Sequence, residues 1–166
     1  MQTAKNVLMD DQLKLLLEKD RIIDTINLLF IATDSRDWEA VKRCFTELVM
    51  FDMSSMTGAA PALTTAQEIA AGWEQGLAPL KAVHHQAGNY RVRIHGDQAE
   101  AFCYATATHF LPNSTGQNTR TFVGSYDFRL INEDKSWRIN QFTFNLKYLD
   151  GNTDLHNPDS QTPNAR

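Results

Sequence analysis

Three histidines and one aspartate form the most prominent candidate for an acid–base centre in this sequence. His84 and His85 are adjacent in a strand-like segment, and His109 lies 25 residues after His84 in the next such segment. Asp34 stands at the end of a long amphipathic segment near the N-terminus. Because imidazole titrates near neutral pH, histidines that neighbouring strands bring together can exchange protons with a substrate. We therefore take Asp34, His84, His85 and His109 as candidate catalytic residues.

Such a set of residues suits the elimination of water. If Asp34 holds His109, that ring can donate a proton to a leaving hydroxyl group while one histidine of the doublet removes a proton from the neighbouring carbon. His109 can equally be a buried histidine that a neighbour satisfies. Small residues share its face of the strand at every second position, namely Ala101, Cys103, Ala105 and Ala107. They either leave room for a cavity or let a helix approach closely, and the sequence leaves both open.

Only one histidine of the doublet is expected to face a cavity, because successive strand residues point to opposite sides of a sheet. A metal site made of the histidines and Asp34 is an alternative, since imidazole and carboxylate suit several divalent ions. Their spacing matches no recognised ligand signature, and we expect neither a metal nor another cofactor.

Helices in the first half of the chain must position Asp34. Apolar residues at three- and four-residue steps predict a helix over residues 10–33, with Leu13, Leu16, Leu17, Ile23, Ile26, Leu29 and Phe30 on one face. Asp37 can cap a second helix over residues 38–45. Residues 48–54 are a strand candidate and residues 56–61 a loop. Thr65 and Glu68 fit a capping box, which predicts a third helix up to about residue 75.

Long strands fill the second half. The candidates cover residues 81–94, 98–111, 119–132 and 136–149, and short turn-like segments separate them. This order predicts an α+β fold in which a strongly curved antiparallel sheet wraps around the N-terminal helices as a cone-shaped roll. The interior of such a cone can hold a small molecule.

Composition restricts the class of protein. The 166 residues suit one domain, which we place at residues 10–150 and which a polar tail at residues 151–166 follows. The net charge of −4, without a basic block, argues against nucleic-acid binding. No apolar run reaches membrane-spanning length, so we expect no membrane partner. Cys44 and Cys103 lie among apolar neighbours and are expected to be buried, reduced thiols in a cytoplasmic protein.

Several short motifs resemble one known family. They are Asp34-Ser35-Arg36-Asp37-Trp38, His85-Gln86-Ala87-Gly88-Asn89, Gly96-Asp97-Gln98-Ala99, Trp137-Arg138-Ile139 and Leu149-Asp150-Gly151-Asn152. In order and spacing they resemble the SnoaL-like branch of the nuclear transport factor 2-like superfamily, and the pattern is most similar to scytalone dehydratase. The resemblance covers about residues 10–152 and implies the cone fold and a dehydratase that needs no metal or organic cofactor.

The resemblance also implies site residues. The dehydratase spacing assigns the catalytic aspartate and histidines to Asp34, His84 and His109, whereas the common SnoaL-like spacing, a histidine four residues before Asn89, selects His85. Two tyrosines of the dehydratase correspond to Thr33 and Met53. Its serine and asparagine fall near Val123 and Ser125. The acid–base residues of the dehydratase are matched in this sequence, and its other polar site residues are not. The resemblance therefore implies the same type of reaction on a different substrate.

Other residues are candidates for the wall of the cavity. Met53, Met56 and Trp73 flank the loop and short helix that lie over the mouth of the cone in this fold. Tyr104, Tyr126, Ser125 and Asn145 are polar strand residues that can orient a substrate or face outward. Each of them can also be an ordinary core or surface residue.

Two functions remain. The first is a cofactor-free lyase of the dehydratase type, or an isomerase or cyclase, which acts on a small hydrophobic oxygenated molecule. The second is a binding or assembly module of the same fold, because a fold does not determine a function. We also expect a homodimer or homotrimer, since the outer face of the sheet carries apolar residues that the helices cannot cover.

Overall fold

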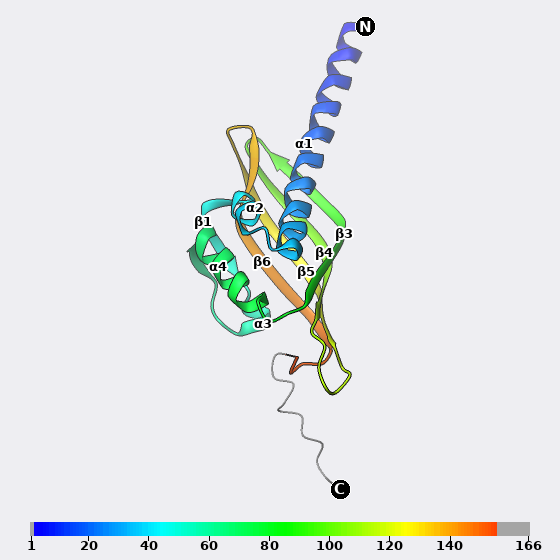
Figure 1. Cartoon of the computed structure of the whole chain (residues 1–166). Helices are drawn as coiled ribbons and strands as arrows, with labels where there is room; N and C mark the ends of the chain where they lie inside the picture. The colour runs from blue at the N-terminus through cyan, green and yellow to red at the C-terminus, as the bar shows by residue number, and fades with distance from the viewer. Residues whose placement is uncertain (1, 156–166) are drawn as a thin grey trace.

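A computed structural model defines residues 2–155, with side chains from Met9 onward. Figure 1 shows helices gathered on the inner side of a long curved sheet. The helices are α1 (Gln2–Ser35), α2 (Trp38–Arg43), α3 (Ser54–Thr57) and α4 (Ala66–Leu77). The strands are β1 (Phe45–Asp52), β2 (Ala62–Thr65), β3 (Ala82–His95), β4 (Gln98–Phe110), β5 (Thr119–Glu133) and β6 (Ser136–Gly151). The expected α+β roll is confirmed.

Among the described side chains of α1, those of its second half pack on the sheet. Ile26 and Leu29 of the predicted stripe are fully buried there, and Ile22 is fully buried where Ile23 was expected. Leu13 and Leu16, which come earlier in the stripe, are more than half exposed. The helix begins at Gln2, well before the predicted start, and its N-terminal turns extend past the end of the sheet (Figure 1). The prediction of a helix with one apolar face was therefore correct, but the sheet covers only the later part of the predicted face.

The sheet has the strand order β2-β1-β6-β5-β4-β3. The predicted antiparallel meander is confirmed for β3 to β6. In contrast, β1 runs parallel to β6, so the sheet as a whole is mixed. Strand β2, which lay in a segment without a predicted element, pairs antiparallel with β1. The capping box at the start of α4 is confirmed by both of its hydrogen bonds, from Glu68 N–H to the Thr65 hydroxyl and from Thr65 N–H to the Glu68 carboxylate.

On each strand of the meander, successive side chains point alternately to the inner and the outer face of the sheet. On β4 the buried small side chains Ala101, Cys103, Ala105 and Ala107 line the inner face, as their spacing predicted. On β3 the pairing register shifts between Gly88 and Arg91, where Asn89 has a φ of 58°. This bulge reverses the alternation, so that odd-numbered residues before it and even-numbered residues after it point toward the helices.

The first residues of the predicted polar tail are packed on the domain. Leu155 is fully buried against Leu80 and Val83, and Asn152 is 2% exposed. The segment predicted as a polar tail therefore begins on the domain, with residues 151–155 next to it, and residues 156–166 lie outside the described part of the chain. Among the described residues, no helix is both long and apolar enough to cross a membrane.

Candidate active site

The end of α1 places Asp34 against strand β3. Backbone bonds from Arg36 N–H to the Thr33 carbonyl and from Asp37 N–H to the Ala32 carbonyl end the helix, with Arg36 in the left-handed conformation (φ 60°). A carboxylate in the last turn faces the negative end of the helix dipole. Donors on a neighbouring element must compensate for this, and they come from β3.

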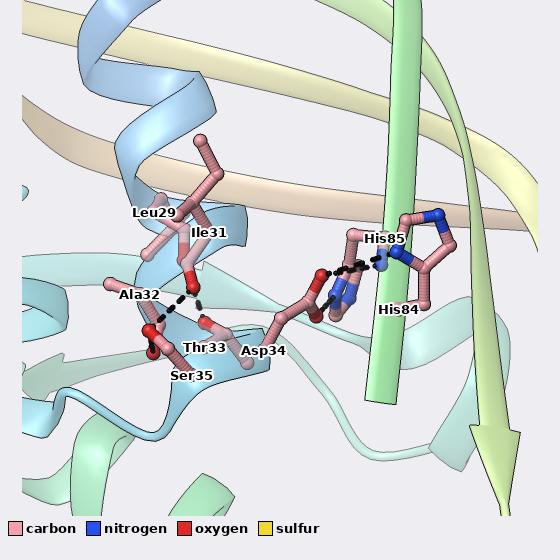
Figure 2. Close-up of polar contacts among 8 residues, drawn as sticks. All are labelled: Leu29, Ile31, Ala32, Thr33, Asp34, Ser35, His84 and His85. Atoms are coloured by element: carbon pink, nitrogen blue, oxygen red, sulfur yellow. Dashed lines mark hydrogen bonds and ion pairs between the residues drawn. The ribbon is translucent and has the colours of Figure 1, made fainter. Parts of the chain in front are cut away.

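His85 on β3 provides two hydrogen-bond donors for the Asp34 carboxylate. Its backbone N–H donates to Asp34 Oδ2 at 2.8 Å, and its ring Nδ1 lies 2.6 Å from Asp34 Oδ1 (Figure 2). The Phe30 ring stacks on the imidazole with a centroid distance of 5.1 Å. Because the carboxylate can only accept, Nδ1 carries the proton and Nε2 holds the free lone pair. The ring is thereby fixed in both tautomer and orientation.

His84 occupies the opposite side of β3. Its side chain is 75% exposed, compared with 11% for His85, and its Nδ1 lies 3.9 Å from Asp34 Oδ2. Figure 2 shows the two rings on opposite sides of the strand. The SnoaL-like spacing thus selects the histidine that reaches the interior, and the dehydratase spacing selects its exposed neighbour.

His85 opens onto an apolar pocket of about 250 Å³ between the helices and the sheet. Helical segments contribute Phe30, Thr33, Met53, Met56, Gly72, Trp73, Gly76 and Leu77, and strands contribute His85, Ala107, His109, Arg120, Phe122, Tyr126, Phe142 and Phe144. This volume is below the roughly 300–1,000 Å³ of pockets for drug-sized ligands, so the pocket has room only for a small molecule. Met53, Met56 and Trp73, which the sequence indicated as wall candidates, are all in this lining.

His109 lines the same pocket but pairs with a different residue from the one expected. Asp34 accepts from His85, whereas His109 Nδ1 lies 3.3 Å from Arg120 Nη2. The predicted Asp34–His109 pair is therefore absent, because His109 is opposite Val83, two positions from the level of His85 on β3. A guanidinium only donates, so His109 Nδ1 accepts and its Nε2 carries the proton. The two pocket histidines thus have opposite tautomers.

Arg120 was missed by the sequence analysis. It is directly opposite His109 in the β4–β5 pairing, and it shares the inner face with Phe122 and Tyr126 at period two. A charged residue in phase with the inward aromatic residues of a strand was the signal that could have revealed it.

Four of the predicted substrate-binding residues lie away from the pocket. Tyr104, Ser125 and Asn145 are opposite one another on β4, β5 and β6, and Val123 is two residues before Ser125 on the same face. The Lys147 ammonium lies 4.1 Å from the centre of the Tyr104 ring, and the Asn145 amide donates to Asp127 at 2.8 Å. Gly124 and Tyr126, the residues on either side of Ser125 in β5, face inward. Because successive strand residues point to opposite faces, Ser125 and the residues level with it are on the outer face of the sheet. The structure therefore gives these residues no access to the pocket.

The pocket contains a tyrosine, although not at the positions of the dehydratase pattern. Thr33 and Met53, which stand at those positions, both line the pocket, and the Thr33 hydroxyl donates to the Leu29 carbonyl. Tyr126 lies in the opposite wall. Burial raises the pKa of Tyr126, and the charges of Cys103 and Asp34 raise it further, so its hydroxyl stays protonated at neutral pH. In the described part of the chain, no three His, Cys, Asp or Glu side chains are grouped as metal ligands.

Comparison with known proteins agrees with this geometry at the level of the fold. The SnoaL-like domain profile matches residues 14–143. A protein of Kribbella flavida, Kfla4162, superposes with a TM-score of 0.79 at 21% identity, over 82% of this chain and 95% of that one. A candidate scytalone dehydratase from Novosphingobium aromaticivorans superposes with a TM-score of 0.72 at 14% identity, over 82% of this chain and 89% of that one.

A third solved structure of this kind is the hexachlorocyclohexane dehydrochlorinase LinA-type3 from Novosphingobium barchaimii. It has a TM-score of 0.70 at 13% identity, over 86% of this chain and 94% of that one. No curated protein sequence matches significantly. Since the profile covers most of the chain, from within α1 to within β6, the protein belongs to the SnoaL-like domain family of the nuclear transport factor 2-like superfamily.

Proposed function

We propose that this protein is a cofactor-free lyase of the dehydratase type, which acts on a small hydrophobic oxygenated molecule by acid–base catalysis at His85 and Asp34. The observation that carries this proposal is the short hydrogen bond between His85 Nδ1 and Asp34 Oδ1, 2.6 Å long, at the wall of an apolar pocket. An oriented imidazole with a free Nε2 lone pair can act as a general base.

The reaction can be written with His85 as the one group that moves protons. For a β-hydroxy carbonyl substrate, Nε2 removes the proton on the α-carbon, and the C–H electron pair passes to the carbonyl oxygen as an enolate. The electrons return to form the carbon–carbon double bond as the C–O bond breaks. The imidazolium then gives its proton to the departing hydroxide, which leaves as water. Asp34 stabilises the transient positive charge on His85.

His109 has a supporting role in this scheme. It lines the pocket and provides a polar group on the side where the oxyanion would develop, without transferring a proton. Residues diagonal to each other on neighbouring strands are about 7–8 Å apart, which leaves space for a small ring between His85 and His109. This assignment differs from the sequence-based hypothesis, in which Asp34 held His109 as the proton donor.

The elimination chemistry is supported by the named relatives of this fold, a candidate dehydratase and a dehydrochlorinase, although their identities to this chain are low. A binding module without chemistry is the second candidate. Its support is the absence of tyrosine at positions 33 and 53, because the dehydratase pattern uses those hydroxyls. An isomerase or cyclase would use the same base with a different substrate.

The test compares the two adjacent histidines. A panel of cyclic β-hydroxy ketones and β-hydroxy acids is incubated with the protein, and formation of the conjugated product is followed by ultraviolet absorbance. His85→Gln should lower kcat by roughly a hundredfold to ten-thousandfold. His84→Gln removes the same group from the exposed face and should leave kcat unchanged. Equal turnover in His85→Gln and the native protein would refute the assignment, and ligand binding without any turnover would favour the binding module.

We also propose a cytoplasmic homodimer or homotrimer. Free, buried Cys44 and Cys103 fit a reducing compartment, and exposed apolar side chains such as Leu48 and Tyr148 remain on the strands. Light scattering coupled to size-exclusion chromatography measures the oligomeric state, and a monomer at micromolar concentration would contradict this proposal.

A further inference from the structure

The guanidinium group of Arg120 is a cation in an otherwise apolar pocket. It extends from the first residues of β5 and lines the pocket beside His109 and Phe122. Arg120 is partly buried, and its guanidinium carbon lies 5.0 Å from the centre of the Phe122 ring. Burial lowers the pKa of Arg120, although a guanidinium keeps its proton in proteins.

The partners of Arg120 carry no negative charge. Nη1 donates to the Thr153 carbonyl at 3.3 Å, and Nη2 donates to His109 Nδ1 at 3.3 Å. Nε is buried and has no hydrogen-bond partner within the described part of the chain. No carboxylate of the described residues lies within ion-pair distance of this guanidinium, whereas Arg129, on the outer face of the same strand, has Glu100 at 3.9 Å. Among the residues that the structure describes, Arg120 therefore has neither a counter-ion nor a full set of acceptors.

Such an arrangement costs stability in the absence of a ligand. A buried donor without an acceptor destabilises the folded state, and more so when the group is charged. An oxyanion would remove this cost, because the planar fork of arginine matches the two oxygens of a carboxylate. The same pocket is also lined by Trp73, Phe142 and Phe144, whose apolar side chains suit the ring of a ligand.

We propose that the pocket selects small apolar ring compounds that carry a carboxylate, and that Arg120 binds this carboxylate. The inference rests on the proposed function in one respect, namely that this pocket is the substrate site. It adds the class of substrate: a ring carboxylic acid whose reacting C–H bond is at the other end of the molecule, near His85.

The register supports this division of the pocket. Arg120 is opposite His109, and Phe122 and Ala107 are at the level of His85. Arg120 and His85 are thus two strands and two residues apart. With about 4.8 Å between strands and about 3.4 Å per residue, their backbones are roughly 12 Å apart. Both side chains line the same pocket, so a substituted ring can lie between them.

A binding experiment tests the proposal without requiring turnover. Isothermal titration calorimetry compares benzoate with benzamide, and cyclohexanecarboxylate with cyclohexanecarboxamide, on the full chain. In the native protein each carboxylate should bind about 10- to 100-fold more tightly than its amide, the range that a charge-assisted hydrogen bond provides. Arg120→Gln should remove this preference while amide binding stays the same. Arg129→Gln changes the net charge equally on the outer face and should keep the preference.

Several results would overturn the proposal. One is equal affinity of the native protein for acid and amide, another is no binding of either acid at 10 mM, and a third is an unchanged preference in Arg120→Gln. Thermal unfolding of Arg120→Met is a second measurement. Because the variant removes an unpaired cation, its Tm should equal or exceed that of the native protein. A clearly lower Tm would mean that Arg120 is a structural residue.

The same assay separates this inference from the proposed lyase activity. His85→Gln and Asp34→Asn should lose turnover yet keep the preference for the carboxylate, because neither side chain contacts Arg120. If these variants keep full turnover while Arg120→Gln loses acid binding, the lyase mechanism is wrong and the carboxylate site remains. If Arg120→Gln alone leaves acid binding intact, the carboxylate site is wrong and the lyase mechanism is unaffected.

Discussion

Asp34 accepts two hydrogen bonds from one residue, the backbone N–H of His85 at 2.8 Å and the ring Nδ1 of His85 at 2.6 Å. The first bond ties the end of α1 to β3, and the second orients the imidazole toward the pocket. One carboxylate therefore links the position of a helix to the tautomer of a base, and the two effects can be separated by substitution.

Asp34→Asn should separate activity from stability. The amide oxygen can still accept from the His85 backbone, but it cannot compensate the positive charge on the ring. We expect kcat for the proposed elimination to fall by roughly a hundredfold or more, with the free energy of unfolding changed by less than about 1 kcal/mol. Asp34→Ala should lose the same activity and also about 1–3 kcal/mol of stability, because the His85 N–H loses its acceptor. Full activity in Asp34→Asn would contradict the role of the carboxylate.

The tautomers of the two pocket histidines should be opposite. His85 donates from Nδ1 to Asp34, whereas His109 accepts at Nδ1 from Arg120. Two-dimensional ¹H–¹⁵N correlation spectra of protein labelled at histidine, recorded at pH 8, distinguish protonated from unprotonated ring nitrogens. We expect the protonated nitrogen to be Nδ1 in His85 and Nε2 in His109. The same tautomer in both rings would contradict the arrangement, and the exposed His84 provides the reference spectrum.

The two cysteines should resist thiol reagents while the protein is folded. Burial raises the pKa of Cys44 and of Cys103 from 9.0 to about 12, although Arg43 opposes the shift at Cys44. Since the thiolate is the reactive form, labelling by a disulfide reagent at pH 8 should be slow until denaturant is added. Rapid labelling of the native protein would show that one thiol is accessible.

These thiols also predict a loss of stability at alkaline pH. Their folded pKa values lie above the unfolded values, so their contribution to stability is complete below about pH 9 and declines between pH 9 and 12. Replacement of both cysteines by alanine should make the unfolding free energy less dependent on pH in this window. Denaturant titrations of both proteins at pH 8 and pH 10.5 measure the difference, and identical slopes with pH would contradict the assignment.

Gly124 should be necessary for the packing of the pocket wall. A Cβ at this position would lie 2.4 Å from the Asn145 carbonyl oxygen and 2.8 Å from the Phe144 ring. Gly124→Ala should therefore destabilise the protein by about 1–3 kcal/mol, as overpacked substitutions do. Gly88→Ala introduces the same group on β3, where no heavy atom lies within 4 Å, and should cost less than about 0.5 kcal/mol. Equal effects in the two variants would show that β6 adjusts freely.

The bond between Glu18 and Trp137 should hold α1 across the sheet. The indole Nε1 donates to Glu18 Oε2 at 2.7 Å, between residues 119 positions apart. A double-mutant cycle with Glu18→Gln and Trp137→Phe should give a coupling free energy of about 1–2 kcal/mol. The exposed pair of Lys42 and Glu39 serves as the control and should couple by less than about 0.5 kcal/mol. Absence of coupling between Glu18 and Trp137 would mean that the apolar contacts of α1 hold it alone.

Much of the scaffold could be predicted from local patterns in the sequence. The periodicity of Ile26, Leu29 and Phe30, the capping box at Thr65 and the four long strands depend on short-range chemistry, and the structure has all of them. The alternation of small residues on β4 also correctly predicted its inner face, because side chains of a strand alternate wherever pairing is regular. The parallel pairing of β1 with β6 was not predictable in this way, since it joins segments far apart in the chain.

The sequence by itself determined which residues are available for acid–base chemistry, while the tertiary structure decided how they combine. Counting back in steps of two from Val92 and Ile94, the inward face of β3 would include His84. The bulge after Gly88 shifts the register, so His85 points inward and meets Asp34. The partner of His109 depends likewise on the β4–β5 register, which places Arg120 opposite it. A register is a property of two paired segments, so neither segment alone contains it.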